Sequence, residues 1–349
     1  MKISLSRIQF FMLLFPLFTG FVYISIQSII IDSGKRAAWL IFIVASILVY
    51  LLFILYEKTY KYFILGKVSS VIYQIYWLFH LSLLVSYTIF VVSTWMSPNT
   101  PKYALLLMLL IPSLYASLSR AETAVNIGAI FGTFIIFFII FILNAADDFE
   151  YRNLVPTSES GLKEWIWGLI YSFSAYRNME CYLILRKYVM KNEKIAGKPL
   201  FYFVFLLFFM YMFSIITVSL YFSLDEFRFI SEPLLYILHT QEVTFIKRLD
   251  LIFVFFWVLI TIITIINFIL VVKLVHFKKK RKYTKMRIVL YHILIFIFAY
   301  YFANFADLQW IRVRYWITFP IFGVLLPIMI ITWNKVRGRT IFDSSNSSS

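Results

Sequence analysis

Long apolar runs with few charges recur along the whole chain, and they constrain its fold more than any other feature. An apolar helix needs about 20 residues to cross the hydrocarbon core of a bilayer. Ten runs of roughly this kind can be marked, at 8–31, 38–56, 73–95, 103–118, 123–144, 164–185, 200–222, 251–272, 288–304 and 315–333. The fourth is the shortest and contains Pro112. The sequence therefore predicts an all-α integral membrane protein with ten transmembrane helices.

Composition indicates the same class of protein. Of the 349 residues, 62% are apolar or aromatic and 14% are charged, and a soluble domain cannot bury so large an apolar share. The first run continues well beyond a signal-peptide core, so it is interpreted as the first transmembrane helix. Residues 1–342 are expected to form a single transmembrane domain, followed by a disordered serine-rich tail at 343–349.

Basic residues are distributed unevenly between the loops. With the N-terminus in the cytoplasm, the cytoplasmic segments carry 22 Lys and Arg and the external segments 10, whereas 12 acidic residues, with Glu164 at the outer edge of the sixth run included, are external and 4 cytoplasmic. This asymmetry follows the positive-inside rule and predicts that both termini are cytoplasmic. The richest run, HFKKKRKYTKMR at 276–287, is interpreted as a topology determinant beside anionic lipid. Nucleic-acid binding is not expected, because the run is juxtamembrane and has no attached domain.

The ten runs divide evenly at the hydrophilic stretch 145–163. Five is an odd number of crossings, so the second half enters the membrane from the side opposite to the first. Two inverted repeats of five helices, at about 8–144 and 164–333, are a common plan of secondary transporters. The span count alone supports this inference.

The first and sixth runs, which begin the two halves, both contain residues that disrupt a helix. In FPLFTGFVY (15–23), Pro16 removes a backbone donor and Gly20 relaxes the helix, and in YSFSAY (171–176) two serines interrupt the apolar pattern. Broken helices at corresponding positions indicate a substrate site, because unwound backbone can present polar groups to a ligand. The alternative is that the small residues only permit close helix packing. The candidate ligand-binding residues are Thr19, Gly20, Phe21, Ser172, Phe173, Ser174, Thr261 and Thr264.

Two charged residues, Arg177 and Glu180, lie inside the sixth run. They are three positions apart, so they share a helix face and can pair. A lone charge at the centre of a membrane helix costs about 2.5–3.5 kcal/mol on an insertion scale. Two interpretations stay open, a structural ion pair and a role in the movement of a ligand, ion or proton.

Catalytic and metal-binding motifs are not found in the sequence. It contains no HExxH, GxSxG or P-loop pattern, and its one cysteine, Cys181, lies in a predicted span. Hydrogen-bonded packing explains the isolated His80 and His292 better than catalysis does. We therefore expect no enzymatic activity, no cofactor and no metal.

One stretch carries a resemblance to a known family. The stretch at 232–257, EPLLYILHTQEVTFIKRLDLIFVFFW, resembles the B subunits of endospore germination receptors. These subunits have a Pro-Leu-Leu-like segment, a Glu-Arg-Leu-Asp-like motif and a tryptophan in the helix that follows. The opening SLSRIQFFMLLF (4–15) is similar to the N-terminus of that family, and Glu180 stands at the position of a Gly-Glu pair. The residues of the structural motif are Pro233, Arg248, Asp250 and Trp257.

The chain departs from the family pattern at several positions, which indicates a divergent member. Lys247 replaces the acid of the Glu-Arg-Leu-Asp motif, and Met179 stands where glycine is favoured before Glu180. Asn126 and Ala129 replace an arginine and a glutamate, and Thr264 occupies a position where many members have lysine.

The resemblance implies a LeuT-like fold of the amino acid–polyamine–organocation transporter superfamily, with broken helices one and six. It implies a site for a small nutrient germinant, often an amino acid, between the first, third, sixth and eighth spans. It also implies a complex with A and C subunits in the spore inner membrane, where ligand binding helps to trigger germination. Two other functions stay open from the residues alone: a secondary amino acid transporter coupled to ions or protons, and an assembly subunit without a ligand.

Overall fold

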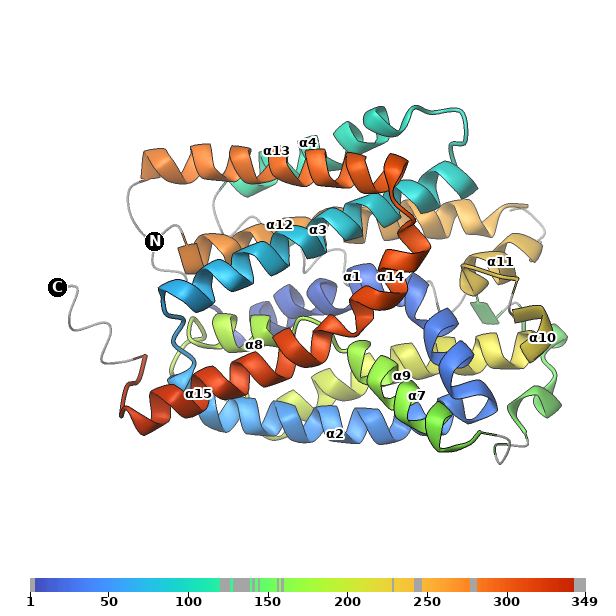
Figure 1. The fold of residues 1–349 in the computed structure, drawn as a ribbon, viewed down its shortest axis with the longest axis horizontal. Coiled ribbons are helices and arrows are strands. Elements are labelled where there is room, and N and C mark those ends of the chain that lie inside the picture. The colour runs from blue at the N-terminus through green and yellow to red at the C-terminus, as the bar shows by residue number, and fades with distance from the viewer. Residues whose placement is uncertain are drawn as a thin grey trace.

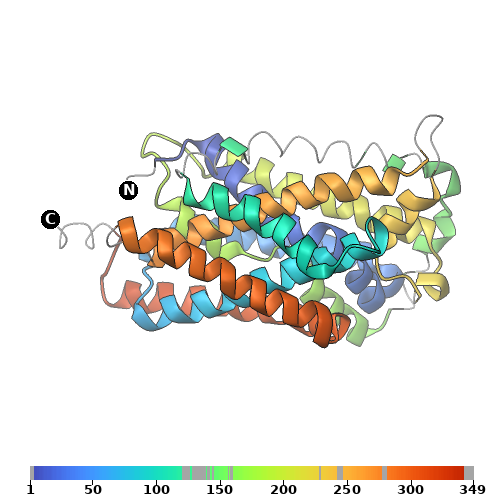
Figure 2. The ribbon, with the colours of Figure 1, turned by 90° about the horizontal axis from the view of Figure 1, so that it is seen from above.

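The protein is a bundle of helices that run approximately along one axis in a computed structural model (Figures 1 and 2). The structure describes residues 4–119, 126–127, 139, 142–143, 145–155, 157, 160–227, 229–241, 247–276 and 281–341. The longer helices are α1 (Arg7–Gly34), α2 (Ala38–Thr59), α3 (Lys67–Trp95), α4 (Lys102–Leu118), α7 (Leu162–Ser174), α9 (Lys198–Tyr221), α12 (Leu249–His276) and α13 (Arg281–Phe305). The shorter ones are α8 (Met179–Arg186), α10 (Leu224–Phe227), α11 (Pro233–Thr240), α14 (Leu308–Trp316), α15 (Leu326–Val336), the π-helical η7 (Pro320–Leu325) and the 3-10 turns η1 (Lys35–Ala37), η2 (Tyr60–Tyr62), η4 (Ala146–Asp148) and η5 (Tyr151–Leu154).

The described helices confirm the prediction of an all-helical protein with apolar spans. In the part of the chain that the structure describes, six helical stretches are long and apolar enough to cross a membrane, and the first of them joins the second part of α1 to η1, α2 and η2. The six stretches are Val22–Tyr62, Lys67–Trp95, Lys198–Tyr221, Leu249–Val275, Thr284–Phe305 and Trp310–Val336. Nine of the ten predicted runs coincide with helices or helix pairs, whereas most of the fifth lies outside the described residues.

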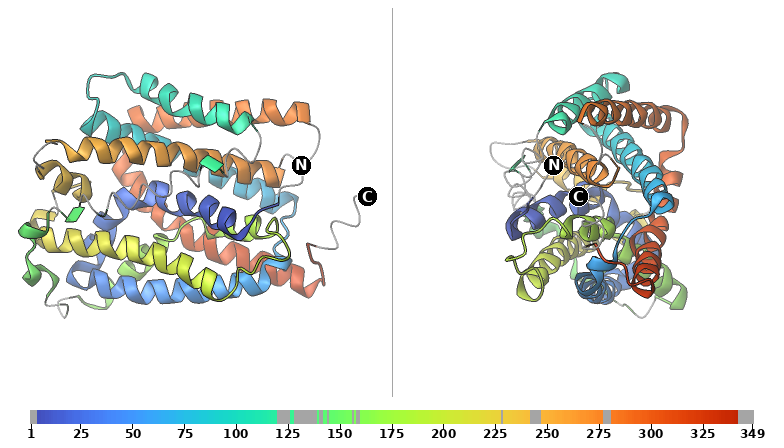
Figure 3. Two further views of the ribbon diagram at one scale, coloured as in Figure 1. Left: turned by 180° about the vertical axis from the view of Figure 1, so that it is seen from behind. Right: turned by 90° about the vertical axis from the view of Figure 1, so that its left-hand side faces the viewer.

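The order of helices across the bundle places α1 and α8 near its middle (Figure 1). Figure 1 shows α4 and α13 at one edge, α3 and α12 next to them, and α2, α7 and α9 at the other edge. The views from behind and from one end show that α14 and α15 lie along the outside of this arrangement (Figure 3). Helix α1 therefore packs against α7, α9 and α12 at once.

One end of the bundle, called the basic end, joins segments that are distant in sequence. It contains residues 4–6, 57–67, 187–198 and 335–341. Leu5 exchanges backbone hydrogen bonds with Tyr188 (2.9 Å) and Met190 (3.0 Å), and the Ile341 N–H donates to the Lys61 carbonyl (2.9 Å). Most of these segments are rich in Lys and Arg.

The opposite end, called the acidic end, contains residues 145–155 and 222–241. The Glu150 N–H donates to the Leu220 carbonyl (2.9 Å), and the guanidinium of Arg36 donates to the Val155 carbonyl (2.9 Å). Asp147, Asp148, Asp225 and Glu226 also lie in these segments. Basic and acidic loops are thus separated along the bundle axis, as the sequence asymmetry predicts.

The predicted break in the first span is wrong. Helix α1 is continuous from Arg7 to Gly34 with Pro16 inside it, although it changes direction along its length (Figure 1). Proline removes one hydrogen bond and its ring crowds the preceding turn, which is enough to bend a helix without unwinding it.

The predicted break in the sixth span is present. Helix α7 ends at Ser174, residues 175–178 form a turn, and α8 begins at Met179. Asn178 adopts a left-handed backbone conformation with φ of 76°, which asparagine tolerates better than most residues. The break therefore lies slightly beyond the two serines, which occupy the last turn of α7.

A buried ion pair holds α2 against α8 at the basic end. We predict that Glu57→Gln lowers the free energy of unfolding by about 3 kcal/mol, because it leaves the Arg186 charge without its partner. Arg186 donates 2.8 Å hydrogen bonds to both Glu57 oxygens, and the two side chains are 12% and 10% exposed. Reversible denaturation in mixed micelles measures the change.

The matched control is Glu150→Gln, whose partner Arg152 is 3.3 Å away with both side chains mostly in the open. Exposed pairs contribute little, so no measurable change is expected. Equal losses in the two variants would contradict the assignment of the Glu57 pair as the stabilising one.

Candidate functional site

The turn between α7 and α8 is buried and is bonded to α1. Asn178 is fully buried, and its Nδ2 donates to the Leu17 carbonyl at 2.6 Å. The backbone just before Asn178 forms a turn, which is stabilised by hydrogen bonds from the N–H groups of Tyr176 and Arg177, each at 3.2 Å. The chain thus interrupts a membrane helix beside α1, in a part of the bundle where polar groups need partners from the protein itself.

Arg177 lies in this turn with no exposed surface. Its Nη2 donates to the Tyr315 carbonyl at 2.9 Å, and its guanidinium carbon lies 3.9 Å from the ring centre of Tyr315 and 4.6 Å from that of Trp316. Among the residues that the structure describes, its Nε and Nη1 atoms have no hydrogen-bond partner. The cation is therefore stabilised mainly by aromatic faces of α14, and part of its donor capacity is unused.

Glu180 is equally buried, one turn further along. Its Oε1 accepts a hydrogen bond from Trp77 Nε1 of α3 at 2.9 Å, and its Oε2 has no hydrogen-bond partner within the described part of the chain. Arg177 and Glu180 therefore bond to different helices and not to each other, so the interpretation as a structural ion pair is wrong. Each side chain keeps an unsatisfied polar atom in the buried interior, where an unpaired polar atom lowers the stability of the fold.

Several carbonyls of α1 receive side-chain hydrogen bonds from the helices around it. A carbonyl has two lone pairs, so it can accept a second bond besides the one within the helix. The pairs are Asn267 to Leu13, Thr264 to Pro16, Asn178 to Leu17, Tyr211 to Phe18 and Trp257 to Gly20, at 2.6–3.1 Å. The expectation that unwound backbone in the first span faces a ligand is therefore wrong at these positions, because this chain's own side chains bond them.

The remaining candidate residues lie around the same helices. Thr19 donates to the Phe15 carbonyl, Thr261 to that of Trp257, and Ser174 to those of Ile170 and Trp316. The hydroxyl of Ser172 is buried without a partner, and Phe173 packs against Phe319. Phe21 belongs to α1, but its side chain lies outside the described residues. Serine and threonine bonds to their own helix are typical of packing positions.

Gly20 marks a close approach between α1 and α12. A Cβ atom at this position would lie 2.0 Å from Thr264 Oγ1 and 2.9 Å from its Cβ. No side chain fits without a shift of one helix. Gly20 therefore allows the contact in which Thr264 reaches the Pro16 carbonyl (2.9 Å).

The motif residues before and within α12 join it to neighbouring elements. Arg248 donates to both oxygens of the buried Asp250 (2.9 and 2.8 Å) and to the Trp95 carbonyl (3.2 Å). His239 of α11 contacts Asp250 at 3.2 Å, and Pro233 is the first residue of α11. These contacts fit a role in packing the segment against α3 and α11.

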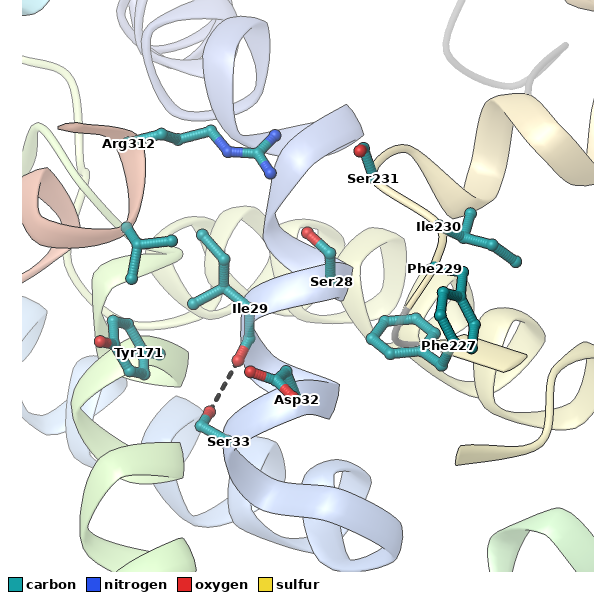
Figure 4. A pocket seen from close by; sticks show the side chains of 11 residues that line it. Ser28, Ile29, Asp32, Ser33, Tyr171, Phe227, Phe229, Ile230, Ser231 and Arg312 are labelled. Carbon is teal, nitrogen blue, oxygen red and sulfur yellow. Dashed lines mark hydrogen bonds between the residues drawn. The ribbon is translucent and has the colours of Figure 1, made fainter. Parts of the chain in front are cut away.

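A pocket of about 410 Å³ opens at the acidic end, between α1, α7, α14 and the segment that precedes α11. Its charged lining residues are Asp32 and Arg312, and its serines are Ser28, Ser33 and Ser231 (Figure 4). Within the ranges that the structure describes, no His, Cys, Asp or Glu side chains gather in a way that could hold a metal ion. The pocket and the turn at Arg177 thus share α1, α7 and α14 as their walls.

Residues 4–306 match the family model described as spore germination protein. The chain belongs to this family. The match covers most of the predicted spans, and it confirms the family resemblance of residues 232–257. No curated protein matches the chain.

Several residues of this spore germination protein were not among the sequence candidates. Trp77, Asn178 and Tyr315 hold or surround the two buried charges, and Glu232 forms a buried pair with Arg312. A polar residue next to a predicted break was a signal for Asn178. Nothing in the sequence indicated that the Arg177 guanidinium would lie on the rings of residues 315 and 316, because that contact depends on tertiary packing.

The left-handed turn at Asn178 leads to a prediction about stability. We expect Asn178→Ala to destabilise the protein by about 2 kcal/mol, since it loses the bond to Leu17 and places an ordinary residue at positive φ. Asn178→Gly removes the hydrogen bond but relieves the backbone strain, so it should lose about half as much. Thermal unfolding in detergent compares the two. A glycine variant as unstable as the alanine variant would contradict a backbone contribution.

Proposed function

We propose that this spore germination protein is the B subunit of a nutrient germinant receptor and binds a small germinant such as an amino acid. The observation that carries the proposal is the interruption between α7 and α8. There, Arg177 and Glu180 are fully buried and each keeps polar atoms without a partner. In a site of low dielectric constant these atoms interact strongly with opposite charges. A small zwitterion provides both, a carboxylate for Arg177 and an ammonium group for Glu180.

Ligand binding at this turn can bias the arrangement of several helices. The turn is bonded to α14 through Arg177 and to α1 through Asn178, and Glu180 is bonded to α3 through Trp77. A ligand shifts an equilibrium only if it binds one arrangement better than the other. A ligand that engages the free atoms of Arg177 and Glu180 changes the balance of these three contacts, and this is the proposed trigger.

The proposal includes the architecture of the related transporters. We place the helices in two inverted repeats, at about 8–144 and 164–333, in an amino acid–polyamine–organocation type of fold. The basic end is cytoplasmic with both termini, because loops rich in Lys and Arg remain on that side. The protein works in the spore inner membrane with an A subunit and a C subunit, and the separated basic and acidic ends support this orientation.

A secondary amino acid transporter coupled to ions or protons is the second candidate. The free Oε2 of the buried Glu180 favours it, because intramembrane carboxylates often bind coupling cations or protons. An assembly subunit without a ligand is the third. Genes for A and C subunits beside this one favour the receptor over the transporter, and uptake of labelled substrate into vesicles favours the transporter. Intact assembly after disruption of the central site separates the third candidate from the first.

Germination of a deletion strain, assayed across amino acids, sugars and salts, identifies the nutrient that depends on this protein. With that nutrient, we predict that Glu180→Gln shifts the half-maximal concentration upward by about tenfold or more, since a hydrogen bond to a charged group contributes about 1.5–3 kcal/mol. The control Glu193→Gln changes a carboxylate at the basic end and should leave the response unchanged. A normal response in the Glu180→Gln strain would remove this side chain from the site.

Gly20 provides a steric test of the same function. We predict that Gly20→Ala abolishes the nutrient response while the protein remains in the membrane, because its Cβ meets Thr264 at 2.0 Å. Gly66→Ala is the matched control, since the nearest atom to its Cβ is Ser69 Oγ at 3.9 Å. Dose–response curves and immunoblots of spore membranes measure both variants. An unchanged curve for Gly20→Ala would show that the α1–α12 contact is not needed for the response.

A further inference from the structure

The pocket at the acidic end contains a buried cation that is only partly satisfied. The Arg312 side chain is 6% exposed and lines the pocket from α14. Its Nη1 lies 3.2 Å from Glu232 Oε1, whereas its Nε has no hydrogen-bond partner among the described residues. A guanidinium presents five donors in a planar fork that suits a carboxylate. The contact with Glu232 and the approach to the Tyr87 ring therefore leave part of this donor set unused.

The pocket wall near Arg312 also carries hydroxyl groups, of which Ser28 and Ser33 already donate to carbonyls of α1, at 3.1 and 2.7 Å. Figure 4 shows Ser28 of α1 and Ser231 on the same side of the pocket as the guanidinium, with Asp32 and Ser33 lower in the view. Ser231 directly precedes Glu232, so the segment that lines the pocket also carries the carboxylate that pairs with Arg312. The volume of about 410 Å³ lies within the usual range of small-molecule sites.

Glu232 can release Arg312 without losing every partner. Its Oε1 also accepts a hydrogen bond from Tyr87 of α3 at 3.1 Å, and the residue is 3% exposed. Burial raises the pKa of the Glu232 carboxyl, although Arg312 and Tyr87 act in the opposite direction. Desolvation therefore offsets part of the attraction between Glu232 and Arg312, as is common for buried ion pairs.

We propose that the pocket at the acidic end is a binding site for a small carboxylate, which displaces Glu232 from Arg312. The carboxylate accepts hydrogen bonds from the Arg312 fork, and Glu232 keeps the Tyr87 hydroxyl. The site is separate from the turn at Arg177 and rests on the proposed function only in its orientation toward the outside. It gives a germinant with a carboxylate a first contact before it reaches the interior.

Contacts also connect this site to the bend of α1. The Tyr87 ring lies edge-on to Trp257 with centroids 6.1 Å apart, and Trp257 Nε1 donates to the Gly20 carbonyl at 2.9 Å. Arg312 itself lies 5.1 Å from the centre of the Tyr87 ring. Release of Arg312 by Glu232 therefore alters the surroundings of a side chain that packs on the α1 contact.

The test measures protection of a thiol in the pocket of the purified full-length protein in nanodiscs. Ser231→Cys is labelled with N-ethylmaleimide in the presence of acetate, acetamide or sodium chloride at matched ionic strength. Ser231 is exposed, whereas the native Cys181 is buried and gives the background rate. Acetate should slow labelling, and neither acetamide nor chloride should. The control Asn99→Cys, also exposed and in the α3–α4 turn, should be labelled at the same rate in all three.

Two variants separate a binding site from a structural ion pair. In the Ser231→Cys background, Glu232→Gln removes the competing carboxylate, so the acetate concentration for half protection should fall by about tenfold. Arg312→Lys keeps the charge but loses the fork, so it should weaken protection.

Acetate that protects no better than acetamide or chloride would overturn the proposal, as would protection that Glu232→Gln leaves unchanged or weakens. Unchanged protection in Arg312→Lys would overturn it as well. None of these measurements uses germination, so their failure leaves the central site at Arg177 and Glu180 untouched. Failure of the Glu180→Gln germination test would in turn leave this pocket untouched.

Discussion

Hydrogen bonds from surrounding side chains to the carbonyls of α1 hold the centre of the bundle together. Within a membrane, each backbone polar group needs a partner from the protein itself. The bent helix α1 presents a run of carbonyls to neighbouring helices, and side chains from α9, α12 and the α7–α8 turn donate to them. Because donors come from three directions, the position of α1 determines where the other helices lie.

Two buried charges depend on that arrangement. Arg177 is covered by aromatic rings of α14, and Glu180 is held by an indole of α3. Neither neutralises the other by direct contact, so the turn keeps a separated positive and negative group inside an apolar bundle. Such an arrangement lowers the stability of the fold. Proteins retain destabilising buried charges mainly where these charges have a function. The same reasoning applies to Arg312 and Glu232, which satisfy each other only in part.

Sequence reasoning predicted the helices well and the polar contacts poorly. Apolar run length depends on the thickness of the bilayer, so the ranges of α1, α2, α9 and α12 could be read directly. The break at residues 175–178 was also signalled, because serines and charges interrupt an apolar run there. Pro16 and Gly20 gave a similar signal in the first span, yet α1 stays helical, because donors from α12 stabilise its bent backbone. The partners of Arg177, Glu180 and Glu232 come from distant segments, and no local pattern encodes them.

The short bridge between Leu5 and Val189 has a mechanical consequence. Leu5 lies two residues before the first residue of α1 and bonds to the backbone on both sides of Val189, just after α8. The residues just before α1 and those just after α8 are therefore joined by backbone hydrogen bonds at one point. A displacement of the chain that leaves α8 would therefore strain two backbone hydrogen bonds at the entry to α1.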